Sequence, residues 1–305
     1  MKMINKDFIV SEQDIASFQD RGFLLLKKFF NEDMIAYLQR RTSEQIAAPT
    51  DKYQSGFNRL AFDMFEGDQQ IDDLLQDPTY RKTVLALTKR NLLFTQSIGF
   101  ELKKNTSAGF PWHIGTQSFG YHRAEDFGCT IWTPLAPIDT SKQRSGMAYT
   151  PKNIISGEFM YNNVDPAVFD CLEKRANSGQ KVEMAEFMEL RDGPLNAVAM
   201  KTLLDYFCVE DDFELGDALI FDKYVIHRSV MLEVGPLELR AAFVMRFVCE
   251  TSQYDYKRAH SLEIPRKYFG YAGPTKFHLE VCESDGDLIK NSPLFPDREK
   301  RLIAA

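Results

Sequence analysis

Helix-like periodicity fills the first 90 residues of the chain, whereas the second half contains mostly strand-like segments. Ser11 is the expected N-cap of a helix that ends near Gln19, and Asn31 is the expected N-cap of a helix over 34–46. Further helical periodicity covers 71–90. We therefore expect the first 90 residues to form a helical jacket around a sheet that later residues build.

Apolar, β-branched and aromatic segments predict the strands of that sheet. They cover 23–30, 91–102, 129–138, 213–223 and 239–248. At 305 residues the chain is longer than a typical domain, but β-rich cores with helical additions reach this length as one unit. The expected fold is therefore one α+β domain over 1–305, mostly β in its core.

The segment 152–200 is polar and helix-like and contains no strand signal. Insertions of this kind between core strands often form active-site lids, and they also occur as plain structural subdomains. Both interpretations stay open for this segment.

Composition excludes several classes of protein. Hydrophobic residues make up 44% of the chain and charged residues 27%, as in ordinary globular proteins. No apolar run is long enough to cross a membrane and no signal peptide pattern begins the sequence, so we expect a cytoplasmic protein without a membrane partner. Five widely spaced cysteines predict neither disulfides nor a zinc site, and a net charge of −7 disfavours nucleic-acid binding.

Two histidines and an arginine form an ordered set with a chemical meaning. His113 ends a loop, His227 follows an apolar strand, and Arg240 lies in the next predicted strand. Two imidazoles with few other ligands leave positions on iron(II) for an oxoacid and dioxygen, and a guanidinium forms a bidentate pair with a carboxylate. A single histidine on a strand is more often a core group than a ligand, so the prediction depends on the whole set.

The sequence resembles the phytanoyl-CoA dioxygenase-like non-haem iron oxygenases over nearly its whole length. The segments that carry the resemblance are GFLLLKKFF, PWHIG, CTIWTPLAP, SGMAYTP, LGDALIFDKYVIH and LRAAFVMRFV. The resemblance implies a double-stranded β-helix, or jelly-roll, of the cupin type. It also implies iron(II) bound by His113 and His227, with 2-oxoglutarate bound by Arg240 and dioxygen as the oxidant.

Gly115 departs from the pattern of this family, whose hydroxylases have Asp two residues after the first histidine. Glycine cannot ligate a metal, and the open position suits an anion such as chloride. We therefore expect a halogenase with His113, Gly115 and His227 at its catalytic centre. The alternatives are a hydroxylase whose site is completed by water or a nearby acid such as Glu101, and a non-catalytic binding module in which Gly115 serves a turn.

Within this family the chain is most similar to the halogenase domains of curacin-type polyketide synthases. The similarity rests on His113-x-Gly115, the spacing from His227 to Arg240, and Arg246. It implies chlorination of a 3-hydroxy-3-methylglutaryl group on an acyl carrier protein, with neighbouring polyketide synthase domains as further partners. A local basic patch that includes Lys103 and Lys104 would have to attract an acidic carrier, because the net charge is negative.

Arg246 and Thr130 are the next candidate site residues. Arg246 shares a strand face with Arg240, so it is expected to bind the substrate carboxylate or, alternatively, an acidic side chain of the protein. By resemblance, Thr130 helps to bind the cosubstrate and the halide, while a core hydroxyl bonded to its own backbone is the competing interpretation.

Three further residues complete the expected site. Gln96, or its neighbour Ser97, is expected to donate a hydrogen bond to 2-oxoglutarate. Tyr121 and Phe119 are expected to line the mouth of the substrate pocket, although aromatic residues are equally common as packing.

Overall fold

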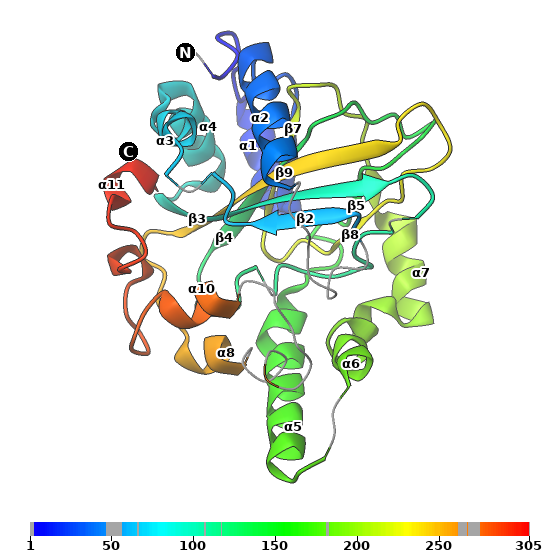
Figure 1. The fold of residues 1–305 in the computed structure, drawn as a ribbon, viewed down its shortest axis with the longest axis vertical. Helices are drawn as coiled ribbons and strands as arrows, with labels where there is room; N and C mark the ends of the chain where they lie inside the picture. The colour runs from blue at the N-terminus through cyan, green and yellow to red at the C-terminus, as the bar shows by residue number, and fades with distance from the viewer. Residues whose placement is uncertain are drawn as a thin grey trace.

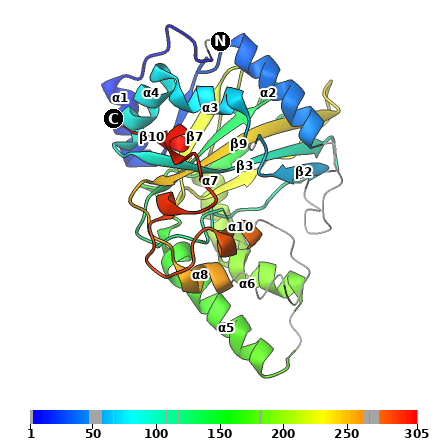
Figure 2. The same ribbon diagram turned by 60° about the vertical axis from the view of Figure 1, so that its left-hand side comes forward.

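The computed structural model describes residues 3–46, 57–65, 67–106, 108–116, 118–180, 183–261, 267 and 275–304. In this part of the chain an antiparallel main sheet lies between two groups of helices (Figure 1, Figure 2). The N-terminal helices cover one face of the sheet. A small second sheet and the later helices lie on the other side.

The N-terminal helices are α1 (Glu12–Arg21), α2 (Glu32–Gln45), α3 (Gln69–Gln76) and α4 (Pro78–Thr88). The predicted caps are confirmed, since the side chains of Ser11 and Asn31 accept hydrogen bonds from the first turns of α1 and α2. The helical periodicity predicted over 71–90 corresponds to two helices, α3 and α4. Asp77 caps α4 and Pro78 begins it, because proline lacks the N–H that would continue α3.

The main sheet has the order β1-β7-β4-β9-β3-β10, and β2 pairs with β3 outside this path. Its strands are β1 (Phe23–Leu26), β2 (Arg59–Phe62), β3 (Leu92–Lys103), β4 (Gly128–Pro134), β7 (Ala218–Asp222), β9 (Leu239–Cys249) and β10 (Leu302–Ile303). β1 is shorter than the predicted strand 23–30. It ends because Lys28 turns the chain with φ 52° and the Asp217 carboxylate accepts hydrogen bonds from Lys27 and Lys28.

The second sheet has the order β6-β5-β8, with β5 (Met147–Tyr149), β6 (Val209–Glu210) and β8 (His227–Ser229). Its side chains pack against the main sheet, as when Tyr149 packs on Phe23 with ring centroids 4.6 Å apart. The two antiparallel sheets do not join into a closed barrel in the described residues. This arrangement of sheets and helices is the expected jelly-roll core with its helical jacket.

The segment 152–200 is helical where it is described, as its pattern predicts. It contains a π-helical turn (Met160–Val164), α5 (Asp165–Asn177), α6 (Met184–Asn196) and the start of α7 (Val198–Phe207). α5 extends away from the sheets (Figure 1). The chain ends with α8 (Tyr256–Ser261), α10 (Thr275–Glu280), a 3₁₀ turn (Ile289–Asn291) and α11 (Arg298–Arg301) before β10. Among the described residues no helix is both long and apolar enough to cross a membrane.

Candidate active site

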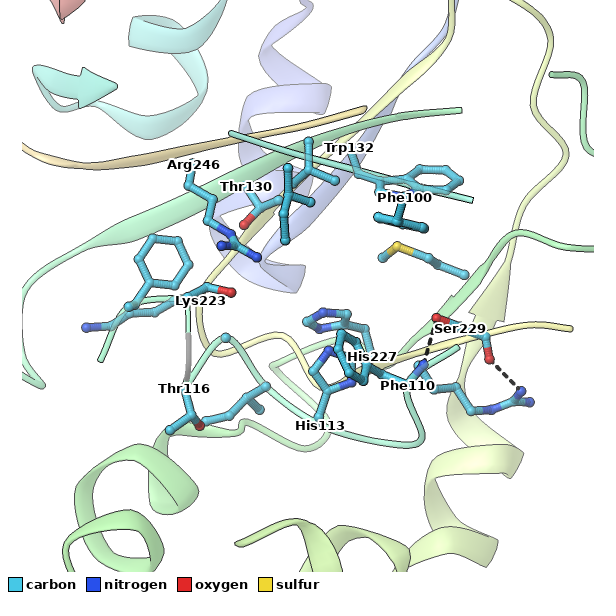
Figure 3. Close-up of a pocket in the computed structure, with 18 of the residues that line it drawn as sticks. Phe100, Phe110, His113, Thr116, Thr130, Trp132, Lys223, His227, Ser229 and Arg246 are labelled. Atoms are coloured by element: carbon cyan, nitrogen blue, oxygen red, sulfur yellow. Dashed lines mark hydrogen bonds between the residues drawn. The ribbon is translucent and has the colours of Figure 1, made fainter. Parts of the chain in front are cut away.

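His113 and His227 come together at the edge of the second sheet. His227 begins β8, and His113 lies in the loop after β3. Their backbones form an antiparallel bridge with two N–H···O=C hydrogen bonds, and each nitrogen lies 2.9 Å from its acceptor oxygen. The imidazole centroids are 4.2 Å apart, and both rings lie next to one another in the cavity of Figure 3.

Hydrogen bonds to the backbone orient both imidazole rings. Nδ1 of His113 lies 2.7 Å from the carbonyl oxygen of Pro111, and Nδ1 of His227 lies 2.8 Å from that of Val225. A carbonyl oxygen only accepts, so each Nδ1 carries the proton and each Nε2 keeps a free lone pair. Two neighbouring Nε2 lone pairs of this kind fit a divalent transition metal.

Burial keeps both histidines neutral. It lowers the pKa of His113 to about 4, and together with the charge of His113 it lowers the pKa of His227 well below its usual value. A neutral imidazole is the form that binds a metal. The two rings are therefore available as ligands at physiological pH.

Arg240 is a buried cation with unused donors. It is 1% exposed, one Nη donates to the carbonyl of Ser145, and its Nε and other Nη are buried without a hydrogen-bond partner among the described residues. Its guanidinium carbon lies 5.4 Å and 5.6 Å from the ring centroids of Trp132 and Phe100, which line the cavity. Burial lowers the pKa of Arg240 to about 9. A carboxylate fits these donors, because it would satisfy them and balance the charge.

Arg246, Thr130 and Phe119 line the cavity together with the two histidines and Gly115. Arg246 and Thr130 are cross-strand partners on β9 and β4. In Figure 3 the Arg246 guanidinium and the Thr130 side chain point toward the space above the imidazole rings. The structure thus places these candidates in the same cavity as the two histidines.

Gln96 and Tyr121 are not among the cavity residues. Gln96 is 2% exposed, and both polar atoms of its amide are buried without a partner among the described residues. It borders a separate hollow on β3 beside Ser97, whose hydroxyl donates to the carbonyl of Met64. Tyr121 is fully buried and its hydroxyl donates to Thr95 at 3.0 Å. Tyr121 belongs to the same buried cluster as Phe119, but its ring contacts His122 and His278 and does not line the cavity.

Glu101 cannot supply a third metal ligand in this arrangement, contrary to one of the alternatives from the sequence. Its carboxylate accepts hydrogen bonds from Arg59 at 2.7 Å and 3.0 Å and from Asn58, and it does not line the cavity. The register explains this, because Glu101 pairs with Arg59 across β2 and β3. In the described part of the chain no group of three or more His, Cys, Asp or Glu side chains is arranged to hold a metal.

Several cavity residues were missed from the sequence. They are mainly aromatic or charged: Phe57, Phe62, Phe100, Phe110, Trp132, Phe221, Arg191, Asp192, Lys223 and Arg228. Arg228 could have been found because it directly follows His227. Arg191 and Asp192 come from α6, and no local signal predicts that this helix reaches the cavity.

Lys223 is buried, donates to the carbonyl of Ala124 at 2.8 Å, and has its pKa lowered to about 7 by burial.

The remaining histidines lie outside the cavity. His122 and His278 are buried in the core beside Tyr121, whereas His260 is partly exposed and stacks on Tyr256 with ring centroids 3.7 Å apart.

Among the comparisons with known proteins, the comparison with solved structures shows the fold. No protein-family model matches the sequence, and a search of curated proteins found no match. Among solved structures, the non-heme alpha ketoglutarate dependent carbocyclase SnoK from nogalamycin biosynthesis is similar, with a TM-score of 0.61 and 11% identity. The alignment covers 92% of this chain and 93% of SnoK.

Two further structures contain ligands. The epimerase SnoN, in complex with Fe3+, alpha ketoglutarate and nogalamycin RO, has a TM-score of 0.53 and 13% identity over 80% of this chain and 85% of SnoN. EctD from S. alaskensis, with bound Fe, has a TM-score of 0.52 and 15% identity over 84% of each chain. At these identities the similarity concerns the architecture: the chain has the jelly-roll fold that these iron-dependent proteins share.

Proposed function

We propose that this chain is an iron(II)- and 2-oxoglutarate-dependent halogenase, with His113 and His227 as metal ligands and Arg240 as the anchor of the cosubstrate. One observation carries the proposal. Two partly exposed, neutral imidazoles with Nδ1 hydrogen-bonded to the backbone line one cavity, while position 115 beside them has no side chain. Iron(II) with 2-oxoglutarate, dioxygen and chloride supplies the power to replace an unactivated C–H bond with C–Cl.

The residues of the chain bind and orient the reactants. The carbonyl oxygens of Pro111 and Val225 fix the two imidazole rings, so that both present Nε2 to the same space. Arg240 supplies two unused donors to the distal carboxylate of 2-oxoglutarate. Aromatic side chains form much of the cavity wall, and Thr130 and Arg246 supply polar groups above the histidines.

The substrate part of the proposal follows from the resemblance in sequence. We take the substrate to be an acyl group on a carrier protein of polyketide biosynthesis, probed as 3-hydroxy-3-methylglutaryl carrier protein. Arg246 offers a cation for the free carboxylate of such a group. The expected basic patch is weakened at Lys104, whose ammonium pairs with Glu238 and donates to the carbonyl of Gly235. Carrier docking therefore needs other cations than Lys104.

One observation favours a hydroxylase as the second candidate. Asp192 lines the same cavity and is a carboxylate that could approach the metal. Both of its oxygens already accept hydrogen bonds from Arg191, with Nε to Oδ1 at 2.8 Å. A carboxylate held in this way is a weaker candidate ligand than the two free imidazoles.

Anaerobic titration of iron(II) and 2-oxoglutarate, with and without chloride, tests the proposal. We expect a visible charge-transfer band that changes with chloride and that His113→Ala and His227→Ala both abolish. His260→Ala, at a partly exposed histidine, is the matched control and should keep the band. A band that is indifferent to chloride would favour the hydroxylase, and no band at all would favour a non-catalytic binding module.

A further inference from the structure

The Phe119 ring fills the space beside two glycines. A Cβ atom added to Gly115 would lie 2.8 Å and 3.1 Å from ring carbons Cδ2 and Cε2. A Cβ atom added to Gly128, the first residue of β4, would lie 2.9 Å and 3.0 Å from Cε1 and Cδ1. Distances below 3.0 Å are too short for packed carbon atoms. The ring therefore excludes a side chain from both positions.

The Phe119 ring has little freedom to move aside. The residue is 1% exposed, and its N–H donates to the carbonyl of Gly115 at 2.9 Å, which closes a turn between the two residues. The hydroxyl of Tyr161 donates to the carbonyl of Phe119. The ring also contacts His122 in an edge-on arrangement with centroids 5.6 Å apart. Phe119 borders the cavity on one side and a packed core on the other, so a shift of the ring would break these core contacts.

The backbone does not require glycine at position 115. The glycines with positive φ in the described residues include Gly109 and Gly216 but not Gly115. An L-residue could adopt this backbone conformation without strain of the left-handed kind. The turn proposed as an alternative explanation of Gly115 thus does not by itself call for glycine. The neighbouring Phe119 ring is what requires glycine at position 115.

We infer that Phe119 is a specificity-determining residue of the site: its ring keeps position 115 free of a side chain, so that no carboxylate joins His113 and His227 on the metal. The inference rests on the proposed function, because it assumes that the two histidines bind a metal. It has a direct consequence for Gly115→Asp. That substitution alone does not create a third ligand, because the aspartate cannot be accommodated while the ring is present.

The steric part is tested without metal by a double-mutant cycle of thermal unfolding. Gly115→Ala should lower the unfolding midpoint by about 4 °C in the wild type. In the Phe119→Ala background it should have almost no effect, since the clashing ring carbons are gone. Gly128→Ala is the matched control for the opposite edge of the ring and should show the same pattern. Additive effects of Gly115→Ala and Phe119→Ala would overturn the inference.

Phe119→Val replaces Phe119→Ala if the larger cavity prevents folding. Valine also lacks the ring carbons that meet the added Cβ atoms, but it leaves less empty space in the core. The same loss of coupling is expected with this variant. Full retention of the 4 °C effect of Gly115→Ala would again overturn the inference.

The metal part is tested by calorimetric titration with Co²⁺. In the wild-type background, Gly115→Asp should bind Co²⁺ no tighter than Gly115→Ala. In the Phe119→Ala background, Gly115→Asp should bind Co²⁺ at least about tenfold tighter than Gly115→Ala, because the carboxylate then gains room to act as a ligand. An equal gain in both backgrounds would contradict the inference, as would an equally large gain with Gly128→Asp.

Failure of the inference and failure of the proposed function give different results. If the wild type binds no Co²⁺, the proposed function fails, whatever the thermal cycle shows. If the wild type binds Co²⁺ through His113 and His227 but the thermal and metal cycles are additive, the proposed function stands and the role of Phe119 is refuted.

Discussion

At the scale of single residues, the site combines satisfied and unsatisfied polar groups. The Nδ1 atoms of His113 and His227 are bonded to carbonyl oxygens, so these rings are fixed before any ligand arrives. Arg240 is the opposite case, with two buried donors that lack partners in the described residues. A buried unpaired cation destabilises a fold, so a group of this kind is expected where a ligand compensates it.

Arg240→Met should therefore weaken the binding of 2-oxoglutarate without lowering the stability of the ligand-free protein. The unfolding midpoint of the ligand-free protein should stay equal or rise, because the substitution removes a buried charge. In the wild type, Co²⁺ with 2-oxoglutarate at about one hundred times its dissociation constant should raise the midpoint by about 5 °C. Differential scanning fluorimetry measures both values.

In Arg240→Met the part of the rise that depends on 2-oxoglutarate should be lost, while the part due to Co²⁺ remains. Arg298→Met, at an arginine whose side chain is 53% exposed, is the control and should keep both parts. A 2-oxoglutarate shift of wild-type size in Arg240→Met would refute the assignment.

At the scale of elements, α7 is tied to the loop that carries the first histidine. The indole N–H of Trp112 donates to the carboxylate of Asp205 on α7 at 3.1 Å, and Asn196 donates to the carbonyl of Trp112 at 2.8 Å. Arg228, next to His227, lies 5.1 Å from the Trp112 ring centroid. Asp205 on α7 also lies 3.5 Å from Nε of Arg228, so α6 and α7 together contact the immediate neighbours of both candidate metal ligands.

Asp205→Ala should loosen this connection. It leaves the indole N–H of the buried Trp112 without its acceptor, so the free energy of unfolding should fall by about 1–2 kcal/mol. Co²⁺ affinity should fall as well, because Trp112 precedes His113. Asp205→Asn keeps an acceptor oxygen and is the matched control, with a smaller loss in urea unfolding. Equal stability of wild type and Asp205→Ala would show that the hydrogen bond contributes nothing.

At the scale of the whole molecule, the residues proposed to bind the metal and the cosubstrate come from both sheets. His227 lies on β8 of the second sheet, whereas Arg240 lies on β9 of the main sheet. A metal with bound 2-oxoglutarate would therefore connect two sheets that otherwise meet mainly through side chains such as Tyr149 and Phe23. Connections of this kind stabilise the folded state against local opening.

Hydrogen–deuterium exchange should detect this connection. Without ligands, the amides of β3 and β9 in the main sheet should exchange more slowly than those of β8, which has three residues. Addition of Co²⁺ and 2-oxoglutarate should slow exchange in β8 most. In Arg240→Met the protection due to Co²⁺ should remain and that due to 2-oxoglutarate should vanish. Unchanged exchange in β8 of the wild type would speak against a ligand shared by the two sheets.

The sequence by itself predicted the helix caps and the long strands of the main sheet. Caps at Ser11 and Asn31 and strand-like composition are local signals, and the structure confirms the two caps. The structure also brings the imidazoles of His113 and His227 together, whereas Arg240 is not among the residues that line their cavity. Element ends were less well predicted, because turns such as the one at Lys28 depend on a carboxylate far along the chain, that of Asp217.

Only the tertiary structure decided which side chains share the cavity. Tyr121 and Glu101 are close in sequence to site residues, yet Tyr121 packs against His122 and His278 outside the cavity and Glu101 pairs with Arg59. Asp192 is distant in sequence and lines the cavity. The physical reason is that strand alternation specifies which face of a sheet a side chain points to. The packing of loops and helices onto the sheets specifies which other side chains it contacts.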